Sequence, residues 1–306
     1  MDEATLALLK PDESLGQYLS RIKKDKIESG VPVLDRCTAF HRSDVVELSG
    51  VVGSGKTEFL YSVAVSCILP RVANGVDFGG RGQHVIFLDL DYKFDIFRVS
   101  NLLQHRIQST LRASRPAGST KLNVEIVEIV TQTFERLHVF RCENSFQFLA
   151  TLKSLSIDFL PTLYSEGGSL GAILVDDISS YWDVQKELKE YRRSASRRHS
   201  SSKEGTSTLE SIRKTLEELQ TLCQVPIFVT RRVPSLRAVR ENPSYELNAL
   251  WTDFTTKSAS LGILGKQPSI AAPCRPNVRR ISWVKPELHT EVNFVIEKGG
   301  GVQSCS

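Results

Sequence analysis

Apolar and polar positions divide this chain into short buried runs and longer segments of helical spacing. The apolar runs have the length and β-branched content of strands buried on both faces of a parallel sheet, and they lie at 45–48, 85–88, 137–140, 172–175 and 226–229. Segments with apolar residues at helical spacing separate most of them. Strands that alternate with helices predict an α/β fold, with a mainly parallel sheet flanked by helices.

Start and stop signals place the helices. The first follows a glycine-rich turn and is stopped by Pro70, and Asp95 is placed to cap a second helix. A third is centred on 148–155, and a capping box at 207–210 is expected to open a fourth. Apolar spacing and β-branched content conflict at 124–134, which fits either a helix or a strand.

Clusters of turn-forming residues predict loops or turns that connect these elements, at 72–82, 109–120 and 161–168. Three late apolar segments have no helix between them, and we expect them to be antiparallel strands added at one edge of the sheet; they lie at 259–264, 280–284 and 292–296.

The first part of the chain has a different pattern. Apolar residues at helical spacing predict an amphipathic helix over 11–28, closed by Gly30. Such a helix either covers the core or docks a partner. We therefore expect an N-terminal helical or linker segment, 1–43, followed by one domain over 44–306.

The composition excludes some classes of protein but does not indicate a particular function. Hydrophobic residues make up 41% of the 306 residues, and the net charge of +4 permits an anionic partner without requiring one. The six cysteines are scattered, which argues against a zinc site and a disulfide framework and fits a reducing compartment. No apolar run has the length of a membrane span, so we expect a cytosolic or nuclear protein without a membrane partner.

The strongest chemical signal is a phosphate-binding loop between the first strand and the first helix. It has the pattern G-x-x-x-x-G-K-T and consists of Gly50, Val51, Val52, Gly53, Ser54, Gly55, Lys56 and Thr57. Glycines let backbone N–H groups approach a phosphate chain, the lysine reaches its terminal phosphates, and the threonine hydroxyl binds Mg²⁺. Asp176 ends a later apolar strand and suits the carboxylate that also holds this ion. The predicted cofactors are ATP and magnesium.

A basic, serine-rich segment lies between the strand that ends at Asp176 and the next predicted helix, at about 192–206. It contains Arg192, Arg193, Arg197, Arg198 and His199. Such a run is commonly a solvated loop, and the alternative is an electrostatic contact with nucleic acid, because clustered arginines neutralise phosphates whatever the base sequence.

Three stretches resemble the eukaryotic recombinase paralogues, and they lie at 55–70, 87–95 and 176–182. The resemblance covers about residues 35–265 and implies a RecA-like ATPase core. It further implies a nuclear role in the repair of DNA double-strand breaks by homologous recombination. The implied partners are other recombinase paralogues in a hetero-oligomer that assists the main recombinase, and single-stranded or branched DNA contacted through that complex.

Two positions depart from the active recombinases. Asp91 stands where they place a glutamate that positions the attacking water, and Arg232 stands where they usually place a glutamine. A carboxylate shorter by one methylene falls about 1 Å short, and such a misplacement can cost about 10²-fold in rate. We therefore take Asp91 as a weak catalytic candidate and favour a mediator subunit that binds ATP but turns it over slowly. An autonomous filament-forming ATPase and a P-loop enzyme acting on a small molecule are the alternatives.

Overall fold

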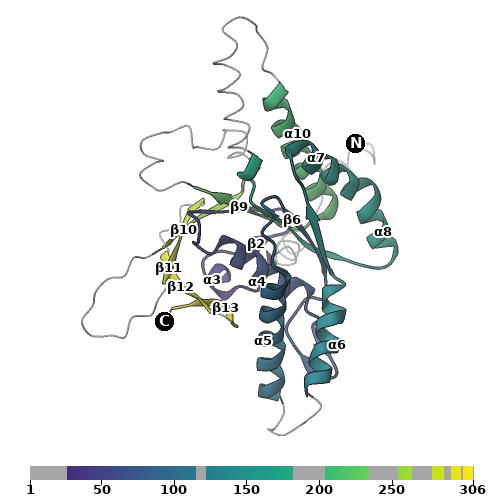
Figure 1. Cartoon of the computed structure of the whole chain (residues 1–306), viewed down its shortest axis with the longest axis vertical. Helices are drawn as coiled ribbons and strands as arrows, with labels where there is room; N and C mark the ends of the chain where they lie inside the picture. Colours follow the sequence, from purple (N-terminus) through teal and green to yellow (C-terminus); the bar gives the residue numbers. More distant parts are fainter. Residues whose placement is uncertain are drawn as a thin grey trace, which may run out of the picture.

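A single large sheet forms the centre of the molecule (Figure 1). The computed structural model describes residues 26–114, 122–181, 204–233, 254–263, 278–285, 291–297 and 299–305. Within these ranges nine strands form this sheet, and in spatial order they are β13 (Gly301–Ser304), β12 (Glu291–Glu297), β11 (Arg279–Lys285), β10 (Lys257–Ile263), β3 (Val45–Gly50), β9 (Ile227–Arg232), β8 (Leu170–Asp176), β6 (His84–Asp89) and β7 (Leu137–Arg141).

Neighbouring strands from β10 to β7 run parallel, and β11, β12 and β13 continue the sheet antiparallel beyond β10. Each predicted strand is present, with bounds that differ from the prediction by at most three residues, so the α/β fold expected from the sequence is confirmed. The mainly parallel sheet with an antiparallel extension at one edge fits a RecA-like core.

Helices cover both faces of the sheet. One face carries α3 (Pro32–Asp35), α4 (Lys56–Ile68), α5 (Ile96–Ser114) and α6 (Leu122–Phe134). The other carries α7 (Ser145–Ser154), the π-helical turn η1 (Leu155–Phe159), α8 (Leu160–Ser165) and α10 (Glu204–Cys223).

Alternation along each strand divides the core in two. On β3, Val46 and Leu48 belong to the cluster beneath α4, whereas Val45 belongs to the cluster beneath α7 and α10. On β8, Leu174 and Val175 divide in the same way. Because both faces of these strands are buried, apolar residues occupy both faces, although β3 also buries the polar residues Glu47 and Ser49.

The described part of the N-terminal segment packs into the core. Phe40 lies in β2 (Phe40–His41), and its ring centroid is 5.7 Å from that of Phe228 and 6.1 Å from that of Trp283. Most of the helix predicted over 11–28 lies outside the described residues. Its last part is not helical, because Lys26–Ile27 forms strand β1, paired antiparallel with β2.

Several connections differ from the sequence prediction. Helix α5 continues through the first part of the predicted loop 109–120, because Leu111 extends its buried stripe by one turn. Pro161 does not start a turn but lies in the first turn of α8, where proline is tolerated. Helix α10 begins at Glu204, one turn before the predicted capping box.

The segment 124–134, whose sequence fitted either a helix or a strand, is part of helix α6. The expected loop at 72–82 contains the short hairpin of β4 (Val72–Ala73) and β5 (Val76–Asp77). No helix of the described residues is both long and apolar enough to cross a membrane.

The prediction was wrong for the first of the late strands. We expected β10 to be an antiparallel edge strand, but it lies parallel to β3 and pairs Ala259 with Leu48. The long connection after β9 allows the chain to cross β3 and return in the same direction. Strand β13 was not predicted, because its four residues are too few to show a pattern.

Candidate nucleotide-binding site

The predicted phosphate loop joins the carboxyl end of β3 to the start of α4. Gly50 is the last residue of β3, and Lys56 is the first residue of α4. A Cβ atom at Gly50 would lie 2.5 Å from the carbonyl oxygen of Leu261 on β10. Gly55 has φ +99°, and a Cβ there would lie 2.6 Å from Cδ1 of Ile296 on β12. Glycine is therefore required at Gly50 by the close approach of the Leu261 backbone, and at Gly55 chiefly by the left-handed backbone conformation.

Lys56 is folded back over the loop. Its Nζ donates to the carbonyl oxygens of Gly50 at 2.8 Å and Val51 at 3.0 Å. Burial lowers the pKa of Lys56, while the negative charges of Asp177 and Asp176 oppose that shift. An ammonium group has three donors, so the lysine has one further N–H to offer a phosphate oxygen.

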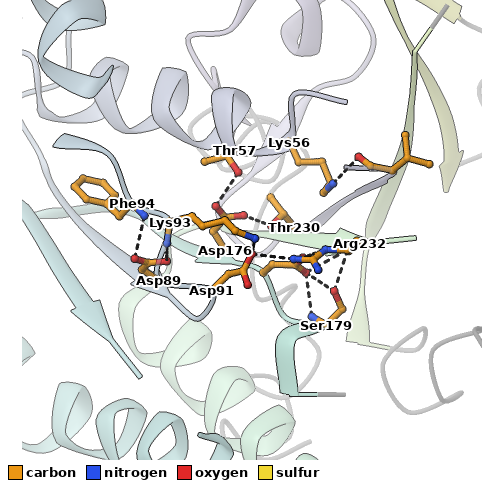
Figure 2. Close-up of polar contacts among 12 residues, drawn as sticks. Lys56, Thr57, Asp89, Asp91, Lys93, Phe94, Asp176, Ser179, Thr230 and Arg232 are labelled. Carbon is orange, nitrogen blue, oxygen red and sulfur yellow. Dashed lines mark hydrogen bonds and ion pairs between the residues drawn. The ribbon is translucent and has the colours of Figure 1, made fainter. Parts of the chain in front are cut away.

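Asp176 lies at the carboxyl end of β8 and meets the start of α4. Its Oδ2 accepts a hydrogen bond from Thr57 Oγ1 at 2.8 Å, and its Oδ1 accepts one from Thr230 Oγ1 on β9 (Figure 2). Burial raises the pKa of Asp176, and the two hydroxyl donors work against that rise. The structure thus brings together the two predicted magnesium ligands, which belong to residues 119 positions apart.

Asp91, the candidate catalytic residue, lies at the same edge of the sheet and is engaged in ion pairs. Its Oδ2 contacts Nζ of Lys93 and lies 2.8 Å from Nη2 of Arg232 (Figure 2). Arg232 also approaches Asp177, with Nε 3.4 Å from Oδ2. The guanidinium group of Arg232 therefore bridges the segment after β6 and the segment after β8.

A second carboxylate holds the loop that carries Asp91. Asp89 is fully buried, and its two oxygens accept the backbone N–H groups of Lys93 and Phe94, each at 3.0 Å. The hydroxyl oxygen of Tyr61, on α4, accepts the N–H of Asp95 at 2.9 Å. Asp89 therefore has a structural role and fixes the loop relative to α4.

The antiparallel strands contribute to the site, which sequence reasoning missed. Arg279, the first residue of β11, donates from Nε to the carbonyl oxygen of Gly53 at 3.1 Å. Arg98 on α5 contacts both oxygens of Glu58, at 2.7 and 2.9 Å, and donates to the carbonyl oxygen of Glu297 at 2.8 Å. Because β11 and β12 are distant in sequence, no local pattern indicated these contacts.

Thr230, Asp177 and Ser179 were also missed as site residues. Ser179 Oγ accepts the backbone N–H of Arg232 at 3.0 Å. Thr230, Asp177 and Ser179 share one feature that could have indicated a role in the site. They lie near or just after the carboxyl ends of buried parallel strands, where ligands bind in open α/β sheets. The basic cluster at 192–199 lies outside the described residues.

The donors and acceptors present fit a magnesium nucleotide. Ser54 Oγ is buried and has no hydrogen-bond partner in the described part of the chain. The loop supplies backbone N–H groups and the N-terminus of α4, which favour phosphate. Thr57 and Asp176 supply the oxygen ligands that Mg²⁺ prefers.

Fold and site together define a P-loop domain of the RecA-like class. No protein-family profile matches the chain. It is 31% identical to the DNA repair protein XRCC2 homolog of Arabidopsis thaliana over 195 residues, which cover 59% of this chain and 52% of that protein. It is also 31% identical to the DNA repair protein XRCC2 of Mus musculus over 143 residues, 47% of this chain and 42% of that protein.

A further similarity covers more of the chain. The DNA repair protein RAD51 homolog 4 of Bos taurus is 24% identical over 267 residues, 82% of this chain and 70% of that protein. For the two XRCC2 proteins, by contrast, the aligned part of this chain spans about half of their length. The resemblance to recombinase paralogues is confirmed, and the 31% identities are to proteins named XRCC2.

Proposed function

We propose that the chain binds Mg-ATP through its phosphate loop and acts as a subunit of a heteromeric complex of recombinase paralogues. The observation that carries the nucleotide site is the hydrogen bond between Thr57 and Asp176, because it joins the two oxygen ligands at the start of α4. Bound magnesium would neutralise the charge of the phosphates. Lys56 would exchange its contacts with the loop carbonyls for the terminal phosphates.

In this proposal the isolated chain hydrolyses ATP slowly. A general base must lie within hydrogen-bond reach of the attacking water, directly or through one other water. The Oδ2 atom of Asp91 is already shared between Lys93 and Arg232, and its side chain is one methylene shorter than the glutamate of active recombinases. ATP then serves mainly to order the loop and the strands packed on it.

The biological role proposed is the repair of DNA double-strand breaks by homologous recombination in the nucleus. The printed names of the relatives support a repair role. The proposed partners are other recombinase paralogues, with single-stranded or branched DNA contacted by the assembled complex. The basic cluster at 192–199 is the proposed DNA-contacting segment of this chain.

The test is affinity purification of the tagged full-length chain from nuclear extract, followed by mass spectrometry. Recovery of recombinase paralogues at near-equal amounts supports the mediator role. Recovery of the tagged chain's own untagged copies alone would favour an autonomous filament, and recovery of metabolic enzymes would favour small-molecule chemistry. Nuclease treatment of the extract is the control that separates protein contacts from bridging by DNA.

A further inference from the structure

A hollow lies at the opposite end of the sheet from the phosphate loop. It has a volume of about 460 Å³ and is lined by residues that precede or begin the parallel strands, including Gln83 before β6, Leu170 at the start of β8 and Val225 before β9. The phosphate loop follows the carboxyl end of β3. Its ligand and that of the hollow therefore bind at different ends of the parallel strands.

Arginines from three segments line this hollow. Arg42 follows β2, Arg71 follows α4, and Arg81 precedes β6. In the described ranges of the chain none of the three guanidinium groups has a carboxylate within ion-pair distance, and Arg42 and Arg71 are exposed. The carboxylate that lines the hollow is Glu28, which is also exposed.

A further guanidinium group, that of Arg106, lies behind the lining of the hollow. Arg81 Nη2 lies 2.7 Å from the buried Sγ of Cys67, and Arg106 Nη1 lies 2.7 Å from Ser66 Oγ, which lines the hollow. Burial raises the pKa of the Cys67 thiol, so the thiol stays neutral and does not balance Arg81. Burial lowers the pKa of Arg106; Cys67 opposes this shift, and the like charge of Arg81 adds to it. Partly buried guanidinium groups that repel one another favour a ligand that brings negative charge.

The available donors favour a carboxylate over a phosphate. Phosphate sites in proteins commonly use free backbone N–H groups. Around this hollow several of those groups are already bonded within the chain, namely the N–H of Gly30 to Asp35, of Gly79 to Asp77, of Arg81 to the Ser66 carbonyl, of Gln83 to the Cys67 carbonyl and of the neighbouring Gly82 to the Leu69 carbonyl. The carboxyl end of α4 also lies here, and its negative dipole end disfavours a doubly charged group. The guanidinium forks of the lining arginines are the charged donors here, and they match a carboxylate in shape and charge.

We propose that this arginine-lined hollow binds an acidic segment of a protein partner. One carboxylate of the segment pairs with Arg71 and Arg81, and neighbouring acidic side chains meet Arg42 at the rim. Glu28 opposes binding by its like charge and so limits the hollow to ligands of modest charge density. The proposal does not depend on nucleotide binding, because the two sites share no residue.

The test measures the binding of a fluorescein-labelled oligoglutamate peptide by anisotropy at physiological ionic strength. The protein is the full-length chain with serine at 192, 193, 197 and 198, so that the basic cluster does not mask the hollow. Arg42→Gln combined with Arg71→Gln should weaken binding at least about tenfold. The matched control combines Arg112→Gln with Lys153→Gln, which removes the same charge from exposed positions elsewhere and should leave the affinity unchanged.

A second variant separates loss of a site from loss of folding. Glu28→Gln removes the opposing carboxylate and should strengthen peptide binding about two- to threefold, which damage to the fold would not do. Equal weakening by the hollow and control variants would overturn the proposal, as would an unchanged affinity for Glu28→Gln. Binding of a single-stranded oligonucleotide that depends on Arg42 and Arg71, without any such dependence for oligoglutamate, would also overturn it and assign a phosphate ligand.

Discussion

Replacing Thr230 by valine removes one hydroxyl group from the centre of the nucleotide site and keeps the shape of the side chain. Thr230 is fully buried on β9, and its hydroxyl donates to Oδ1 of Asp176, whose side chain is also buried. Valine suits a strand as well as threonine does. The main change is therefore that Oδ1 of Asp176, a buried carboxylate oxygen, loses the hydroxyl group that donates to it.

The expected loss of stability follows from that burial. Hydrogen bonds to charged groups contribute about 1.5–3 kcal/mol, and Asp176 keeps its second bond, from Thr57. We therefore expect Thr230→Val to lower the free energy of unfolding by about 2 kcal/mol. With a urea slope of about 3 kcal/mol per M, this moves the midpoint by about 0.7 M.

The dependence on pH gives a second check. Burial raises the pKa of Asp176 above its unfolded value. Its protonated form is therefore favoured in the fold, and the stability this contributes is full below the unfolded pKa and is lost as pH rises through the folded pKa. Thr230→Val should raise the pKa of Asp176 further. The stability that the substitution costs should therefore be smaller at acidic pH, where the Asp176 carboxyl group is neutral, than at alkaline pH.

The assay is urea unfolding of both proteins at acidic and at slightly alkaline pH, followed by tryptophan fluorescence. Thr131→Val is the matched control, because Thr131 is exposed on α6 and its hydroxyl bonds only to the carbonyl of Val127 among the described residues. If Thr230→Val costs no more than Thr131→Val, the buried hydrogen bond to Asp176 does not hold this site together.

Three further predictions test other parts of the account. Gly55→Ala should destabilise the chain by about 2 kcal/mol and abolish nucleotide binding. Gly75→Ala should cost about 1 kcal/mol in thermal unfolding, because Gly75 has a similar φ of +76° but no atom within 4 Å of its added Cβ. Asp91→Glu should raise the single-turnover rate of ATP hydrolysis, and an unmutated monomer already as fast as an active recombinase would contradict the geometric argument. Replacing the four arginines at 192, 193, 197 and 198 by serine should flatten the salt dependence of single-strand binding by the partner-bound complex by about 3 in log K against log salt, and an unchanged slope would assign the DNA contact elsewhere.

Apart from β10, the parallel part of the sheet could be predicted from the sequence because its strands are short, mainly apolar runs separated by segments of helical spacing. The phosphate loop and Asp176 could be predicted because their chemistry fixes residue types at set positions. The direction of β10 could not be predicted, since an apolar run records burial and not which strand it will pair with. The absence of a helix before it suggested an edge hairpin instead.

The residues that surround the phosphate loop could not be predicted from the sequence, for a different reason. Thr230, Arg279 and Ile296 meet the loop residues only after distant strands have joined the sheet, so no local spacing marks them. Arg232 could be singled out by resemblance alone, and its ion pair with Asp91 depends on the relative placement of β6 and β9. Helix boundaries failed where polar composition outweighed periodicity, as at the end of α5.

The central claim is that the loop from Gly50 to Thr57 binds Mg-ATP, and the most direct measurement is the affinity of a fluorescent ATP analogue in the presence of magnesium. Lys56→Ala should weaken binding at least tenfold, about 1.4 kcal/mol, while the exposed control Lys153→Ala should match the unmutated chain. Removal of magnesium by a chelator should weaken binding to the unmutated chain as well. Equal affinity of the unmutated chain and Lys56→Ala would contradict the account.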